Sequence, residues 1–327
     1  MIRLADPEQG GDLLDRVARI RRDVAWDLGI VVPPIRIRDN MELGPNEYRI
    51  RVNGNRVAGG MAVPGQFLAM DSGQVTGRVE GTETTEPALG RTAVWVTPGN
   101  RERAEGQGYT VVDAATVLGT HLTETVRRHS DEILSRQDVA NLVETVKERA
   151  PALVGEVVPN QVSLGRLQKI LQNLLHEGVS IRNLDVILEA LSESATRTQD
   201  LEILSECARN ALARTISQSL VDRDGKMHVV TLDPAVEETI NAGTEHTDRG
   251  SHVTLKLQVM QRIARAIGEE CGKLTSAGHA AVVLCSPQVR LQVKRITEAA
   301  YPRLAVVSYN EIVKDVQVES EGMAVIE

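Results

Sequence analysis

Residues 108–150 constrain the fold more than any other stretch, because a sheet-rich half of the chain gives way there to a helical half. Residues 109–112 are apolar and mostly β-branched, which predicts a strand, and Asp113 follows where a carboxylate can accept the N–H groups of a new helix. Two apolar stripes at helical spacing come next, and the pair Ser135 and Asp138 resembles the cap of the second. A strand and two amphipathic helices need partners for their apolar faces.

The N-terminal part alternates helix and strand signals. Residues 1–11 are polar and glycine-rich, which indicates a linker to a segment that precedes this chain. Residues 12–28 repeat apolar positions at helical spacing and stop at Gly29, which predicts a helix. Alternating residues predict strands at 35–38 and 48–52, and an Asn-Gly pair after the second predicts a hairpin turn.

The next part combines a loop with short elements. Residues 71–91 show no sustained period, so a long projecting loop is expected there. A strand is expected at 93–96 and a short helix at 100–105. Together these signals favour an α/β unit in the first half of the chain, with the long loop and its neighbouring segments as an insertion.

Only helical patterns follow, over residues 155–226. Apolar stripes predict helices at 164–175 and 184–191 and a third helix from about 200 to 220. Their short links predict neighbouring helices and therefore a small all-α subdomain. A winged-helix DNA reader is the alternative, but the segment lacks the positive face that phosphate contact needs.

Residues 227–327 return to an α/β pattern. Strands are expected at 228–232, 280–284 and 304–308, a helix at 255–274, and a further helix capped by Ser286. The continuously apolar strands predict a parallel sheet covered on both faces, and the polar residues 241–251 predict a loop. The expected fold class is therefore multi-subdomain α/β.

Composition excludes several classes of protein. The net charge is −8 with an isoelectric point near 5.5, and only seven aromatic residues occur, which argues against nucleic-acid binding. The three cysteines Cys207, Cys271 and Cys285 lie in apolar patterns and are expected to be core thiols in a reducing compartment. No signal peptide occurs, and no apolar run approaches the roughly 20 residues of a membrane span.

Motifs for catalysis are missing from the sequence. The seven histidines are scattered, and no HExxH, GxSxG or phosphate-binding GxxxxGK[ST] pattern occurs. The lone GxG at 106–108 precedes a strand instead of following one, and the polar run 129–132 fits a solvated helix junction. No enzyme activity, cofactor or metal ligand is therefore predicted.

Four long segments are similar to one family. They are GDLLDRVARIRRDVAWDLGIVVPPIRIRDN, TEPALGRTAVWV, GYTVVDAATVLGTHLTETVRRH and VSLGRLQKILQNLLHEGVSIRNLDVILEAL. On these segments the chain resembles the cytoplasmic domain of the flagellar/invasion protein export pore (FHIPEP) family, nearly from end to end. The GTHL motif and the block from ILSRQ to LQNLL favour its flagellar branch over its injectisome branch.

The resemblance implies a division of the chain and a location. Residues 1–11 would link to a membrane domain absent from this sequence, and residues 12–154 would form a thioredoxin-like unit with an inserted subdomain. A helical subdomain at 155–226 and an α/β subdomain at 227–327 would follow. Such domains form rings, usually nonameric, at the cytoplasmic face of the bacterial inner membrane, so this fragment would be soluble.

The resemblance also implies a docking site. Family members bind export chaperones carrying substrates in a hydrophobic dimple between the first two subdomains, and act with other export-apparatus proteins, including the ATPase complex. Tyr109 matches the dimple aromatic, although it could instead be an ordinary core tyrosine. The further docking positions implied are Gly106, Val139, Ala140, Asp131 and Leu134. Rival functions are an α/β enzyme and a ring scaffold without docking.

Overall fold

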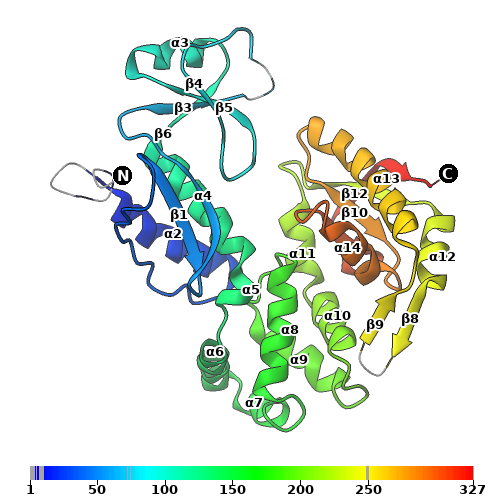
Figure 1. Ribbon diagram of the computed structural model, residues 1–327. Helices are drawn as coiled ribbons and strands as arrows, with labels where there is room; N and C mark the ends of the chain where they lie inside the picture. The colour runs from blue at the N-terminus through cyan, green and yellow to red at the C-terminus, as the bar shows by residue number, and fades with distance from the viewer. Residues whose placement is uncertain are drawn as a thin grey trace. The chain divides into compact units, whose positions relative to one another are not determined.

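The computed structural model describes residues 11–71, 73, 75–247 and 250–326, together with Leu4 and Asp6. It confirms a mixed α/β fold made of two compact units, Met1–Asp138 (unit 1) and Val139–Glu327 (unit 2) (Figure 1). The linker predicted at residues 1–11 lies almost entirely outside the described residues. The boundaries at residues 154 and 226 stay predictions.

Unit 1 begins with a helix and a hairpin. Helix α2 (Leu13–Leu28) ends at Gly29, whose φ of 75° is the left-handed conformation that stops helices. Strands β1 (Glu47–Val52) and β2 (Asn55–Met61) pair antiparallel, as the Asn-Gly signal predicts, and both turn residues have positive φ. The predicted helix and hairpin are confirmed.

A second sheet is built from four strands in the order β4-β5-β3-β6, all antiparallel. The strands are β3 (Phe67–Met70), β4 (Thr82–Thr85), β5 (Thr92–Val96) and β6 (Thr110–Asp113). Between β5 and β6 run a 3-10 turn, η2 (Pro98–Asn100), and the short helix α3 (Arg101–Gly106), which packs against β3 and β6. The helix expected at residues 100–105 is confirmed.

The two helix caps expected in the stretch at 108–150 are both present. Helix α4 (Ala114–Arg128) begins where the Thr116 amide donates to Asp113 Oδ1 at 2.6 Å. After α5 (Ser130–Ile133), helix α6 (Arg136–Arg149) begins with a reciprocal cap, in which Ser135 Oγ accepts from the Asp138 amide and Asp138 Oδ2 accepts from the Ser135 amide.

Two predictions for unit 1 are wrong. Residues 35–38 form no strand, because they follow the pair Pro33-Pro34 and their side chains stay largely exposed, with no neighbouring strand to bond. The expected loop at 71–91 contains β4, whose polar threonines and glutamate occupy the edge of the sheet. A segment with alternating polar and apolar residues therefore forms no strand when it has no neighbouring strand to pair with. A segment without this alternation can form a strand when a neighbouring strand pairs with it.

Unit 2 carries a layer of helices that buries the predicted apolar stripes. They are α7 (Pro151–Val157), α8 (Leu164–His176), α9 (Leu184–Ser194), α10 (Leu201–Ala211) and α11 (Ala213–Leu220). The single helix expected at 200–220 is therefore two helices that meet at Leu212. The break lets α11 pack against the turn η3 (Tyr309–Glu311), where Ser217 Oγ donates to the Glu311 carbonyl at 2.6 Å.

The rest of unit 2 is a parallel sheet covered by helices (Figure 1). Its order is β11-β10-β7-β12, with strands β7 (Lys226–Leu232), β10 (Val282–Cys285), β11 (Ala305–Ser308) and β12 (Gln317–Ala324). The helices are α12 (Pro234–Ala242), α13 (Leu257–Ser276) and α14 (Arg290–Glu298). The predicted parallel pairing is confirmed, and β12 adds an edge strand that the sequence patterns missed.

Other predictions for unit 2 need correction. The expected loop at 241–251 contains β8 (Thr244–Thr247) and part of β9 (Gly250–Val253), which pair as a two-stranded ribbon. Strand β8 is mostly exposed and therefore needs few apolar residues. Ser286 caps no helix, because a turn at 287–289 separates it from α14. The core-thiol prediction holds for Cys271 and Cys285, both buried, but Cys207 is partly exposed.

Candidate functional site

Tyr109 lies at the turn that leads from α3 into β6. Gly108 before it has a φ of 90°, a conformation that favours glycine, and the Tyr109 amide donates to the Ala104 carbonyl at 3.1 Å. This turn brings the partly buried tyrosine side chain against a small core. The buried members of that core are Ala69, Val79, Val96 and Ala104.

Four partly buried apolar residues surround this core, and we call them the Tyr109 patch. They are Phe67, Val94, Tyr109 and Val111. The strand register puts Val94 and Val111 on either side of Ala69, so one row of the sheet carries three apolar residues. The Arg101 guanidinium lies 4.8 Å from the centre of the Phe67 ring, which adds a charge beside the apolar side chains. An apolar surface with a charged neighbour suits a protein partner.

The other predicted docking residues of unit 1 lie in two separate regions, one at α3 and one at α5. Gly106 ends α3, close to Tyr109 in the chain, and a Cβ built there would meet no atom within 4 Å. Asp131 and Leu134 belong to the region of α5, which Figure 1 shows well away from α3. Asp131 is partly exposed, whereas Leu134 is 2% exposed and offers almost no surface.

Val139 and Ala140 are the predicted docking residues of unit 2. Both lie on α6, where Val139 is fully buried and Ala140 keeps part of its surface. The structure therefore brings Gly106 and Tyr109 close together and does not add Leu134 or Val139 to an accessible surface.

A buried polar pair, which sequence patterns did not single out, joins β1 to α4. Tyr48 Oη lies 2.6 Å from His121 Nδ1, and both side chains are buried. Burial lowers the pKa of His121 and raises the pKa of Tyr48, so both groups are neutral near pH 7. The pair satisfies two buried polar groups and anchors the hairpin to the helix.

A network of charged side chains joins the helical layer of unit 2 to its sheet layer. Arg290 is fully buried and bonds to Glu177 and Glu206, and Arg209 bonds to Glu177 and Glu311. Arg290 comes from α14, whereas Glu177 follows α8. Every charged side chain of the network has an opposite charge beside it. We therefore interpret the network as a structural feature that holds the two layers together.

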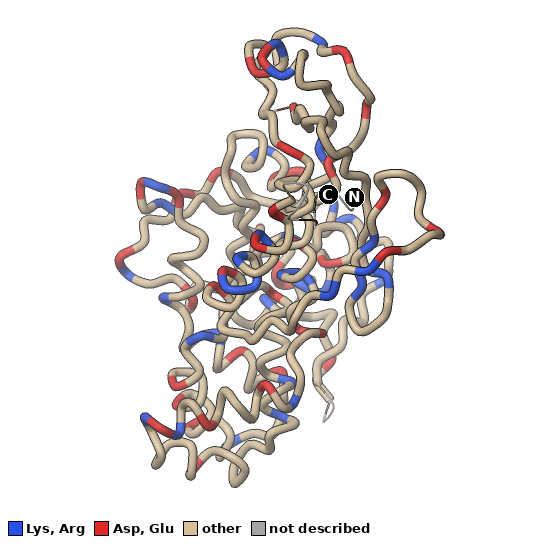
Figure 2. The backbone as a smooth tube through the Cα atoms, turned by 90° about the vertical axis from the view of Figure 1, so that its left-hand side faces the viewer, with Lys and Arg blue, Asp and Glu red and all other residues tan. Residues whose placement is uncertain are grey.

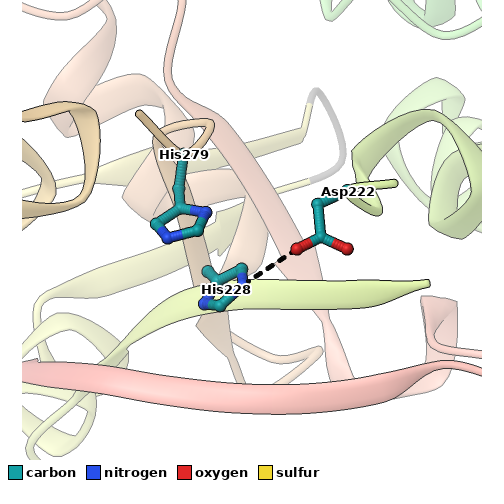
Figure 3. Close-up of side chains that lie close together, drawn as sticks. All are labelled: Asp222, His228 and His279. Atoms are coloured by element: carbon teal, nitrogen blue, oxygen red, sulfur yellow. Dashed lines mark hydrogen bonds and ion pairs between the residues drawn. The ribbon is translucent and has the colours of Figure 1, made fainter. Parts of the chain in front are cut away.

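A second cluster gathers histidines that appear scattered in the sequence. His228 on β7 stacks on His279, with ring centres 3.6 Å apart, and its Nε2 lies 3.2 Å from Asp222 Oδ2 (Figure 3). Asp222 precedes β7 and His279 precedes β10. Starts of parallel strands meet at one edge of a sheet, and the predicted strands at 228–232 and 280–284 are therefore the signal from which this cluster could have been found.

Charges of both signs are mixed along each unit, without a long stretch of one sign (Figure 2). Nucleic-acid-binding surfaces typically carry a basic patch or stripe instead. Among the described residues, no helix is both long and apolar enough to cross a membrane.

Comparison with known sequences identifies relatives over nearly the whole chain. The FHIPEP family profile matches residues 1–317. Flagellar biosynthesis protein FlhA of Bacillus subtilis is 42% identical over 323 residues, which cover 99% of this chain and 48% of that protein. FlhA of Treponema pallidum is 38% identical over 330 residues, which cover 100% of this chain and 46% of that protein. The chain thus spans about half the length of these relatives.

Solved structures have the same fold. Chlamydia pneumoniae CdsV matches with a TM-score of 0.85 at 27% identity, covering 96% of this chain and 91% of that one. CdsV in its complex with CdsO matches with a TM-score of 0.84 at 28% identity, with the same coverage. Nonameric EPEC SctV-C matches in fold, with a TM-score of 0.77 at 21% identity over 95% of this chain and 94% of that one. With the family profile and the FlhA relatives, this likeness shows that the chain belongs to the FHIPEP family.

Proposed function

We propose that this chain is the docking platform of a type III protein export gate of the flagellar branch. In this role it binds export chaperone–substrate complexes and orders protein export during flagellum assembly. The observation that carries the proposal is the 42% identity to a flagellar biosynthesis protein over 99% of the chain. An injectisome export gate is the alternative within the family, and the 42% and 38% identity to two flagellar biosynthesis proteins favours the flagellar assignment.

The Tyr109 patch supports docking without catalysis. A partly exposed aromatic ring on a small apolar core, beside Arg101, offers contact area to a partner protein. We propose Tyr109 and Gly106 as the centre of the docking surface. Asp131 on α5 and Ala140 in unit 2 keep exposed atoms and stay separate docking candidates. The proposal includes no enzymatic step, and a nucleotide turnover that follows the purified chain would contradict it.

The same proposal includes assembly into a ring. EPEC SctV-C, which shares the fold, is nonameric, and CdsV has been solved in complex with another protein, CdsO. We infer that this chain forms a homo-oligomeric ring and contacts other export-apparatus proteins, including the ATPase complex. Attachment to the inner membrane would come from a domain that precedes these residues in the full protein.

A binding experiment tests the docking proposal. Flagellar chaperone–substrate complexes are titrated into the 327-residue chain by calorimetry, and the melting temperature is measured on the same samples. Removing a central aromatic anchor typically costs about 2 kcal/mol, which is roughly thirtyfold in affinity, so Tyr109→Ala is expected to weaken binding by that factor. Tyr309→Ala is the matched control, because Tyr309 is an exposed tyrosine in unit 2.

The outcomes separate the possible roles. Weaker binding with a small change in melting temperature supports docking at Tyr109. Unchanged binding with a large drop in melting temperature makes Tyr109 a core residue and removes the patch from the proposal. Absence of any binding by the unmodified chain overturns the docking function itself and favours a ring scaffold.

A further inference from the structure

The cluster on the parallel sheet places three metal-binding donor groups together. The donor atoms of Asp222, His228 and His279 all lie within 4.8 Å of one another, and all three residues are partly buried (Figure 3). In a tetrahedral zinc site the metal–ligand distances are about 2.0–2.2 Å, so neighbouring donors lie roughly 3.3–3.5 Å apart. Because the two imidazole rings are stacked nearly parallel and their lone pairs lie in the ring planes, the His279 ring would rotate out of the stack to direct a nitrogen at the same ion.

Asp222 is held with one oxygen directed at the cluster. Its Oδ1 accepts hydrogen bonds from the Asp224 amide at 2.8 Å and from the Lys226 amide at 3.0 Å. The other oxygen, Oδ2, faces His228 Nε2 at 3.2 Å.

His228 has its two ring nitrogens in different surroundings. Its Nδ1 lies 2.8 Å from Glu321 Oε1 on β12, and Glu319, opposite His228 in the strand register, is held by Lys226 Nζ at 2.5 Å. Histidines that bind metals usually donate their second ring N–H to such a carboxylate, which leaves the other nitrogen free as a ligand. Here His228 Nδ1–H would donate a hydrogen bond to Glu321, and Nε2 faces Asp222.

We propose that Asp222, His228 and His279 bind one divalent transition-metal ion at the edge of the sheet where β7 and β10 begin. Two imidazoles and one carboxylate suit Zn²⁺ and Co²⁺, whereas Mg²⁺ and Ca²⁺ prefer all-oxygen sites. The ion would link the segment before β7 to the segment before β10, with Glu321 as a positioning residue. This proposal does not rest on the docking function.

The competing arrangement needs no metal. A protonated His228 bonded to both Asp222 and Glu321 would form a closed ion-pair cluster, and His279 would only stack on it. The two arrangements differ in one respect that can be measured: the metal site needs His279 as a ligand, whereas the ion-pair cluster does not.

Metal titration of the untagged 327-residue chain, after treatment with EDTA, tests the proposal. We expect one Zn²⁺ per chain by calorimetry, a visible absorption band with Co²⁺, and a rise in melting temperature of roughly 5–10 °C at a Zn²⁺ concentration about a hundred times Kd. His279→Gln and Asp222→Asn are expected to weaken binding at least tenfold. Glu321→Gln is expected to weaken it about 10- to 100-fold.

His246→Gln is the matched control, because His246 is an exposed histidine of β8 in the same unit. It is expected to leave binding unchanged. The proposal is overturned by an absence of binding at 100-fold molar excess of Zn²⁺, or by binding that His279→Gln and Asp222→Asn leave intact. Circular dichroism without metal checks that each variant folds, and if Asp222→Asn does not fold, His279→Gln decides.

Discussion

Arg290 Nη1 lies 2.7 Å from Glu177 Oε2, although the two residues are 113 positions apart in the chain. Arg290 starts α14 on the sheet layer of unit 2, and Glu177 follows α8 in the helical layer. Arg209 also pairs with Glu177, with Nη1 3.2 Å from Oε2, and its Nε lies 2.6 Å from Glu311 Oε1. These contacts make the two layers of unit 2 depend on each other for the pairing of buried charges.

Replacing Arg290 by methionine is expected to destabilise unit 2 by about 3–5 kcal/mol, because it removes the ion pair of Glu206 and leaves Glu177 with Arg209 alone. Urea unfolding followed by far-ultraviolet circular dichroism measures the change. Arg214→Met is the control, since its ion pair with Asp315 is exposed and worth at most about 1 kcal/mol. An equal decrease in the free energy of unfolding in the two variants would show that the buried network stabilises unit 2 no more than an exposed ion pair does.

The same network predicts an acid dependence. Burial opposes ionisation of Glu177 and is the largest influence on it, but Arg209 and Arg290 together hold its pKa below the usual value. A carboxyl with a lowered folded pKa contributes stability above its unfolded pKa, about 4.3, and loses it as the pH falls through the folded pKa. The protection factors of the α8 and α14 amides against hydrogen exchange, which correct for the slower chemical exchange in acid, should therefore fall below a pH of about 4.3.

Glu177→Gln removes the titrating group and is expected to flatten this acid dependence while lowering stability at pH 7. Glu144→Gln serves as the comparison, because Glu144 pairs with Lys147 on an exposed face of the same unit. An unchanged pH profile in Glu177→Gln would assign the acid sensitivity to other carboxylates.

His121 predicts a separate pH dependence in unit 1. Burial is the main cause that lowers the pKa of this imidazole, so the unfolded chain takes up a proton at a higher pH than the folded chain does. Unit 1 should lose stability as the pH falls from about 6.5 toward the lower folded pKa of His121. Unfolding curves between pH 5 and 8 measure this slope. It should weaken in His121→Gln and persist in His129→Gln, whose side chain pairs with Glu132.

Gly81 tests the packing beneath the Tyr109 patch. A methyl group at Gly81 would overlap the carbonyl oxygen of Trp95 on β5, and backbone atoms cannot rotate away. Gly81→Ala is therefore expected to cost about 1–3 kcal/mol and to raise amide exchange in β4 and β5. Gly99→Ala provides the contrast, because a Cβ there meets no atom within 4 Å. Similar exchange in both variants would contradict the overlap.

Local rules in the sequence determined much of this protein. The end of α2 at Gly29, the turn after Val52 and the cap of α4 at Asp113 each depend on residues within a few positions of one another. The apolar runs at β10 and β11 likewise indicated strands covered on both faces, and their parallel pairing followed. Long segments with family-specific residues gave the family without any structure.

Tertiary structure decided the features whose partners lie far apart in the chain. Residues 35–38 alternate yet have no partner strand, whereas the polar residues of β8 form a strand because β9 pairs with them. The contact of His228 with His279 depends on the crossover through α13, which returns the chain to the same edge of the sheet. Local backbone preferences act over a few residues, but hydrogen-bond partners, burial and the pairing of charges such as Arg290 with Glu177 are set by the folded chain as a whole.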